Sequence, residues 1–149
     1  SPEYFDAYMP NIKSVDIPII DCDISEKTTL NEMLANSHRS AMIEDRVLNS
    51  YGWKKETLFI VIAQDTSMEP LIRDKAEVVV DSSQNQMENN KIYVVKINST
   101  ICIRKLIKSP ITGVISLIPE NTTVFPMDEV KPSNDFQILG KVVYLKTVL

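Results

Sequence analysis

The residue with the clearest chemical potential is Ser67, which lies in a short polar segment between two apolar, β-branched runs. The runs are residues 58–63 and 78–80, so the pattern predicts a strand, a tight turn and a second strand. Pro70 lacks a backbone N–H and fixes its own φ, which constrains the turn that carries Ser67. A serine hydroxyl is a weak nucleophile unless a neighbour accepts its proton, and most serines near turns only cap a backbone group.

Several segments, taken in order, resemble the C-terminal domains of LexA and the phage repressors, the self-cleaving Ser-Lys family. Ser-Met-Glu-Pro at 67–70 resembles the nucleophile segment, and Val-Val-Val-Asp at 78–81 resembles the strand after it. Further matching segments are residues 52–58, 92–95, 101–106, 117–121 and 138–144. The resemblance covers about residues 45–146. It implies a mainly β, LexA/signal-peptidase-like twisted antiparallel fold, with one or two short N-terminal helices.

In the resembled family, a buried neutral lysine accepts the serine's proton. The matching position here is Arg104, because Ile-Cys-Ile-Arg-Lys-Leu at 101–106 lies where the family carries Val-Lys-Arg-Leu. Arginine stays protonated and cannot act as the base. Lys105 is the alternative base, but neighbouring residues of a strand face opposite sides. The resemblance therefore implies Ser67 at the nucleophile position, a dyad broken at Arg104, and Thr66 and Met68 in the loop that would hold an oxyanion.

Two further departures from the family concern glycine. Self-cleaving members carry a small-residue dipeptide, usually Ala-Gly, whereas none of the three glycines here follows an alanine or a cysteine. The glycine ahead of the serine turn is replaced by Asp65. If Arg104 faces the site, Asp65, Glu69 or Asp81 could pair with its guanidinium.

Composition narrows the class of protein. A chain of 149 residues suits one domain with a real core, and the net charge of −4, with scattered Lys and Arg, argues against direct contact with DNA. No apolar run is long enough to span a membrane and no signal peptide is visible, so a cytoplasmic protein is expected. Cys22 and Cys102 are expected as free thiols. No metal or cofactor is expected, because no ligand cluster or phosphate-binding glycine loop is present.

The remaining organisation follows from periodicity and turn residues. Residues 1–24 are expected as an arm or linker with a possible edge strand near Pro18, and residues 25–149 as the peptidase-like domain. Two helices are expected, one capped by Ser25 or Thr28 and one over 40–50, with His38 on a helix and exposed or capping. The predicted strands are 58–64, 76–81, 91–97, 100–107, 113–118 and 136–145. Residues 119–135 are expected as an irregular loop, and Asn89-Asn90 and Asn98-Ser99 as turns.

These observations favour a C-terminal oligomerisation and regulatory domain of a phage-repressor-like transcriptional regulator from a phage or mobile element. It would have lost self-cleavage and would act as a homodimer or larger assembly. DNA would be bound through an N-terminal helix-turn-helix domain, and a regulatory protein is a further candidate partner. One alternative is an active Ser-Lys self-cleaving peptidase that uses Ser67 and Lys105. Another is a partner- or ligand-binding module on the same fold, with a pocket near Ser67 and Arg104 available to an anion.

Overall fold

The computed structural model describes residues 13–133 and 135–146, which form one nine-stranded sheet with two short α-helices and a 3-10 turn. The mainly β fold expected from the sequence is confirmed. The elements in chain order are β1 (Ser14–Ile19), α2 (Leu30–Ala35), β2 (Arg39–Glu44), α3 (Asp45–Tyr51), η1 (Lys55–Thr57), β3 (Leu58–Ile62), β4 (Glu77–Asp81), β5 (Lys91–Ile97), β6 (Thr100–Lys108), β7 (Ile115–Ile118), β8 (Asp128–Val130) and β9 (Phe136–Lys146).

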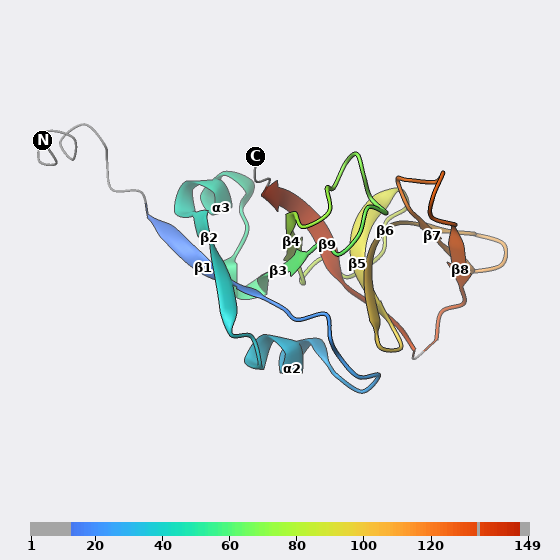
Figure 1. Cartoon of the computed structure of the whole chain (residues 1–149), viewed down its shortest axis with the longest axis horizontal. Helices are drawn as coiled ribbons and strands as arrows, with labels where there is room; N and C mark the ends of the chain where they lie inside the picture. Colours follow the sequence, from blue (N-terminus) through green and yellow to red (C-terminus); the bar gives the residue numbers. More distant parts are fainter. Residues whose placement is uncertain (1–12, 134, 147–149) are drawn as a thin grey trace, which may run out of the picture.

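The strand order across the sheet is β2-β1-β3-β4-β9-β5-β6-β7-β8. All neighbours are antiparallel except β1 and β3, which are parallel and meet only at Ile19 and Ile60. β1 and β2 lie at one end of the molecule and β7 and β8 at the other (Figure 1). The β5–β6 turn contains Asn98 at φ 54°, as its sequence predicted. The closing strand β9 runs through the middle of the sheet, between β4 and β5.

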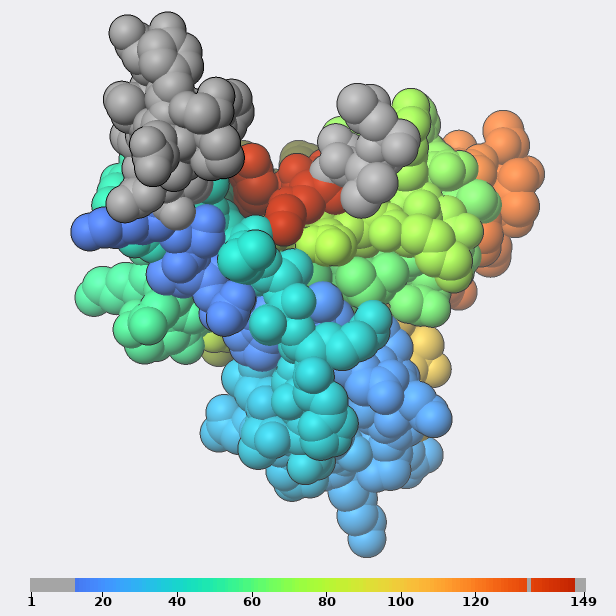
Figure 2. All heavy atoms as spheres, turned by 60° about the vertical axis from the view of Figure 1, so that its left-hand side comes forward, coloured from blue at the N-terminus to red at the C-terminus, as the bar shows by residue number. Residues whose placement is uncertain are grey.

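Three apolar clusters hold the sheet together. The first joins the segment around α2 to the strands beneath it and includes Met33, Phe59 and Met68. The second packs β1, β2 and α3 on β3 and β4, and the third fills the β5–β7 end. Residues 13–45 (blue to cyan in Figure 2) gather on one side of the molecule. The first cluster therefore ties this N-terminal part to the turn that carries Ser67.

The predicted helix over 40–50 is wrong in its first half, because residues 39–44 form strand β2. Ala41 and Ile43 face inward and pair with Ile17 and Val15 of β1, while Ser40 and Met42 are exposed. This is a period of two, and partner-strand pairing outweighs helix propensity in so short a segment. The helix starts only at Asp45 and ends, as predicted, at Gly52, which has φ 71°.

Four smaller expectations also need correction. β1 is not an edge strand, because it lies between β2 and β3, although β3 meets only its last residue. The expected irregular loop 119–135 contains β8, whose three residues are too few to show a period. His38 lies exposed between α2 and β2 rather than on a helix. Thr29, rather than Ser25 or Thr28, caps α2. The arm expected at the N-terminus falls largely on residues 1–12, outside the described residues.

Within the described ranges, neither α-helix has the length and apolar character that a membrane crossing would need.

Gly140 in β9 lies against the backbone of β4 and gives a direct test of this packing. A Cβ added there would lie 2.6 Å from the Asp81 carbonyl oxygen, and backbone cannot move aside cheaply. We expect Gly140→Ala to lower the free energy of unfolding by about 1–3 kcal/mol, measured by urea denaturation. The control Gln137→Ala, at an exposed position of the same strand, should change it by less than about 0.5 kcal/mol. Equal effects of the two substitutions would contradict this close approach of β9 to β4.

Candidate functional site

Ser67 lies in the loop that joins β3 to β4, and this loop is fixed at its neck and at its centre. Ala63 N–H donates to the Ala76 carbonyl oxygen at 3.0 Å, which closes the neck. Met68 and Ile72 are buried in the first apolar cluster, and Ile72 N–H donates to the Met68 carbonyl oxygen at 2.8 Å. Two buried side chains thus anchor the turn beside Ser67, which is itself only 3% exposed.

A second loop, between β7 and β8, supports the same turn. Asn121 N–H donates to the Ser67 carbonyl oxygen at 2.9 Å, and its side-chain amide donates to the Thr66 carbonyl oxygen at 3.3 Å. Asn121 was not singled out from the sequence. The only signal for it was the resemblance of residues 117–121 to the family's loop, because a contact across 55 residues leaves no local pattern.

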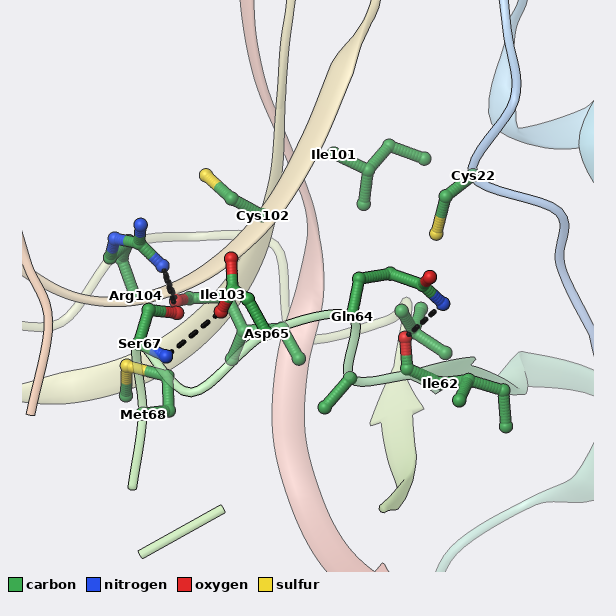
Figure 3. Close-up of a pocket in the computed structure, with 12 residues that line it drawn as sticks. Cys22, Ile62, Gln64, Asp65, Ser67, Met68, Ile101, Cys102, Ile103 and Arg104 are labelled. Atoms are coloured by element: carbon green, nitrogen blue, oxygen red, sulfur yellow. Dashed lines mark hydrogen bonds between the residues drawn. The ribbon is translucent and has the colours of Figure 1, made fainter. Parts of the chain in front are cut away.

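The Arg104 guanidinium lies directly against the Ser67 hydroxyl. Its Nη1 donates to Ser67 Oγ at 2.8 Å and to the Ile103 carbonyl oxygen at 2.8 Å, and the Arg104 and Asp65 side chains both approach Ser67 (Figure 3). Arg104 Nε is buried and has no hydrogen-bond partner in the described part of the chain. Lys105 pairs across the sheet with Ile92 and Ile118, and the alternation of the strand turns its side chain to the face opposite Arg104.

The Asp65 carboxylate is the second charged group at Ser67. Ser67 N–H donates to Asp65 Oδ1 at 2.9 Å. Burial alone would raise the pKa of Asp65, but the adjacent hydroxyl and N–H of Ser67 and the charge of Arg104 outweigh it and lower that pKa. The expectation that Asp65 could pair with Arg104 is met only by this electrostatic influence. Among residues 13–133 and 135–146, no ion pair involves Arg104.

The other two candidate carboxylates have different partners. Glu69 Oε1 accepts a long hydrogen bond, 3.5 Å, from Asp74 N–H. Asp81 accepts hydrogen bonds from Ser83 and Gln84 at the end of β4. Neither is bonded to the guanidinium, so the acceptors of Arg104 among the described residues are two uncharged oxygens.

A small pocket of about 40 Å³ lies beside Ser67. Its walls are mainly apolar and come from the ends of β3, the Ser67 loop and β6, with one residue from the segment after β1, Cys22. Cys22 and Cys102 are both free, and burial raises the pKa of each thiol. Ile101 lies between them in the pocket wall (Figure 3). In the part of the chain that the structure describes, no group of three His, Cys, Asp or Glu side chains is placed to hold a metal ion.

The arrangement around Ser67 can donate hydrogen bonds but has little capacity to accept a proton. A guanidinium is a donor with no acceptor site. The one carboxylate bonded to Ser67 has a lowered pKa, which makes it a weak base. The roles assigned from the sequence to Ser67, Arg104 and Lys105 remain predictions, while the geometry brings Ser67 and Arg104 into contact.

Comparison with known proteins identifies the family. Residues 26–143 match the family described as Peptidase S24-like. The chain belongs to this family. The S24-like chain is also 27% identical, over 119 residues, to an uncharacterized HTH-type transcriptional regulator of Haemophilus influenzae. That match covers 78% of this chain and 49% of the regulator, so the chain spans about half the length of the curated relative it matches. The resemblance to LexA and phage-repressor C-terminal domains is thus confirmed.

The electrostatic coupling of Asp65 and Arg104 can be measured by titration. Following the Asp65 carboxyl carbon by NMR should give a midpoint below the ordinary 3.8. Because the folded-state pKa is lowered, Asp65 stabilises the fold above its unfolded pKa, and this contribution is lost as the pH falls through the folded pKa.

Arg104→Met should raise the Asp65 midpoint, since the guanidinium is one of the causes that lower it. The matched control is Lys105→Met, which removes a cation from the opposite face of β6 and should leave the midpoint unchanged. An equal rise in both variants would mean that Asp65 responds to the net charge of the protein rather than to Arg104.

Proposed function

We propose that this S24-like chain is a C-terminal assembly and regulatory domain of an HTH-type transcriptional regulator that no longer cleaves itself. The parent protein would be of the kind that phages and mobile elements carry and would work in the cytoplasm. The name of the Haemophilus relative, and the half of its length that lies outside the match, support an additional DNA-binding part. The net charge of −4 supports the proposal that this additional part, rather than the S24-like domain, contacts DNA.

The observation that carries the loss of self-cleavage is the 2.8 Å hydrogen bond from Arg104 Nη1 to Ser67 Oγ. Attack by a serine requires a neighbour that takes its proton, and the group in contact with this hydroxyl is a permanent cation. The bond also occupies a lone pair of the oxygen that would attack. Lys105 does not replace the base, because it lies on the other face of β6.

Incubating the full-length parent protein tests this loss of activity. At about pH 10, where an ordinary lysine begins to lose its proton, we expect the parent to remain intact, and Ser67→Ala to behave identically on denaturing gels. Fragmentation that Ser67→Ala abolishes would mean that the chain is an active Ser-Lys peptidase, and it would overturn the proposal.

Assembly is the second half of the proposed function, and we propose the outer edge of strand β2 as the contact surface. Within the described residues β2 has one neighbour, β1, so its other backbone edge has no partner strand there. Exposed strand edges favour pairing with another chain. The first and last residues of β2 are Arg39 and Glu44. Antiparallel pairing of two copies about a twofold axis near Met42 would therefore bring the basic end of each strand next to the acidic end of the other.

The middle of this edge is apolar as well. Met42 is 64% exposed in the centre of β2. Tyr51, equally exposed at the end of α3, stacks on Trp53 with ring centroids 4.6 Å apart. Exposed apolar groups next to a strand edge that has no partner strand among the described residues support a contact surface at this end of the sheet.

Sedimentation of the isolated chain at high micromolar concentration tests the assembly. We expect a dimer or larger species. Met42→Lys should weaken self-association by roughly tenfold, or about 1.4 kcal/mol, because it would place two like charges beside the twofold axis.

The matched control is Ile111→Lys, which introduces the same charge at a residue that is 93% exposed between β6 and β7. This position is far from β2 in the sheet order and should leave association unchanged. A strict monomer at all concentrations would remove assembly as the role of the domain, and equal weakening by both variants would remove β2 as its surface.

A further inference from the structure

Asp65 lies at the mouth of the Ser67 pocket, and a hydrogen bond within its own loop holds its carboxylate there. Its Oδ1 accepts the Ser67 N–H at 2.9 Å, and it lines the pocket together with Ser67 and Arg104. Asp65 is exposed whereas Ser67 is buried. The carboxylate therefore covers a buried backbone donor from the solvent side.

The backbone N–H of a serine nucleophile has a catalytic role of its own in serine enzymes. In acyl transfer, backbone N–H groups beside the nucleophile stabilise the oxygen that becomes negative when the hydroxyl attacks. A backbone N–H is a single donor. Here that donor is already used by a negatively charged oxygen of the same chain, so an entering carbonyl or carboxylate would have to compete with Asp65.

Arg104 supplies a positive charge beside the Ser67 N–H and the Asp65 carboxylate. Its guanidinium donates to Ser67 Oγ, and its charge is among the causes that lower the pKa of Asp65. Its Nε is buried and no described residue bonds to it, so its donor capacity is only partly used within residues 13–133 and 135–146. An N–H donor bonded to the carboxylate, and a nearby guanidinium that acts on it by charge without a direct bond, are ordinary parts of an anion site.

We propose that the Asp65 carboxylate is an internal ligand of an anion site formed by Ser67 N–H and Arg104, which accepts a carboxylate from another molecule when Asp65 is displaced. The inference deepens the proposed function, because it rests on Ser67 being a binding rather than a reacting residue. The pocket of about 40 Å³ has room for roughly three water-sized groups. This limits the entering group to a small carboxylate, such as formate or the head of an acidic side chain.

The simpler interpretation is a local Asx turn, in which an aspartate accepts the N–H two residues further along. That interpretation accounts for the 2.9 Å bond, but it assigns no part to Arg104. The two interpretations differ in what happens when the carboxylate is removed. If the bond is only a local turn, the protein without the Asp65 carboxylate binds no anion. If it belongs to an anion site, removing the carboxylate leaves a site that an external anion can occupy.

The experiment removes the internal ligand and supplies an external one. In Asp65→Ala, the ¹⁵N and ¹H shifts of the Ser67 amide are followed during titration with sodium formate, against sodium chloride at equal ionic strength. We expect saturable formate binding that is more than roughly tenfold tighter than in the unmodified protein, because the charge-assisted hydrogen bond no longer has an internal competitor. Asp65→Gly, which has the residue of the resembled family, is a second opening variant.

The matched control is the double variant Asp65→Ala/Arg104→Met, which should lose the binding. Equal formate shifts in Asp65→Ala and the unmodified protein, or binding that survives in the double variant, would overturn the proposal. The readout is binding and not cleavage. A failed titration therefore leaves the loss of self-cleavage standing, and fragmentation of the parent protein would refute that loss whatever formate does.

Discussion

The positive charge of Arg104 is the constraint around which the Ser67 site is organised. A guanidinium taken partly out of water is costly unless its donors are satisfied, and this one has no ion-pair partner among the described residues. It uses Ser67 Oγ and the Ile103 carbonyl oxygen instead. Since the first of these belongs to the β3–β4 loop, the charge holds that loop against β6. Moving the loop away would leave the guanidinium with a single neutral acceptor.

The rest of the fold also holds the β3–β4 loop in that position. Met68 and Ile72 bury the centre of the loop in the first apolar cluster, and Asn121 bonds it from the other side through Ser67 and Thr66. Elements distant in the chain therefore converge on the loop between residues 66 and 72. Such convergence makes the site rigid, because displacement of the loop breaks apolar packing and hydrogen bonds at the same time.

Most of the sheet could be predicted because its strands are β-branched runs bounded by turn residues, and β5 began and ended where the sequence placed it. Strand β2 was missed because Ser40–Glu44 carries apolar residues at spacings that fit a helix as well as a strand. Only its pairing with β1 decides between them. Asn121 and the bond from Ser67 N–H to Asp65 were missed for a related reason. Each depends on how the loops fold in space, and neither leaves a period in the sequence.

Two departures that look separate in the sequence, arginine at 104 and aspartate at 65, form one electrostatic unit in the structure. A lysine that serves as a base must be neutral, and a carboxylate close to it would stabilise its charged form and raise its pKa. Asp65 is therefore unsuited to a lysine at position 104 and well suited to an arginine, whose charge lowers the pKa of the aspartate in return. Each residue stabilises the charged form of the other. A site with this pair is stable as a charged, hydrogen-bonded structure, which is the opposite of the neutral amine and open N–H that a serine nucleophile needs.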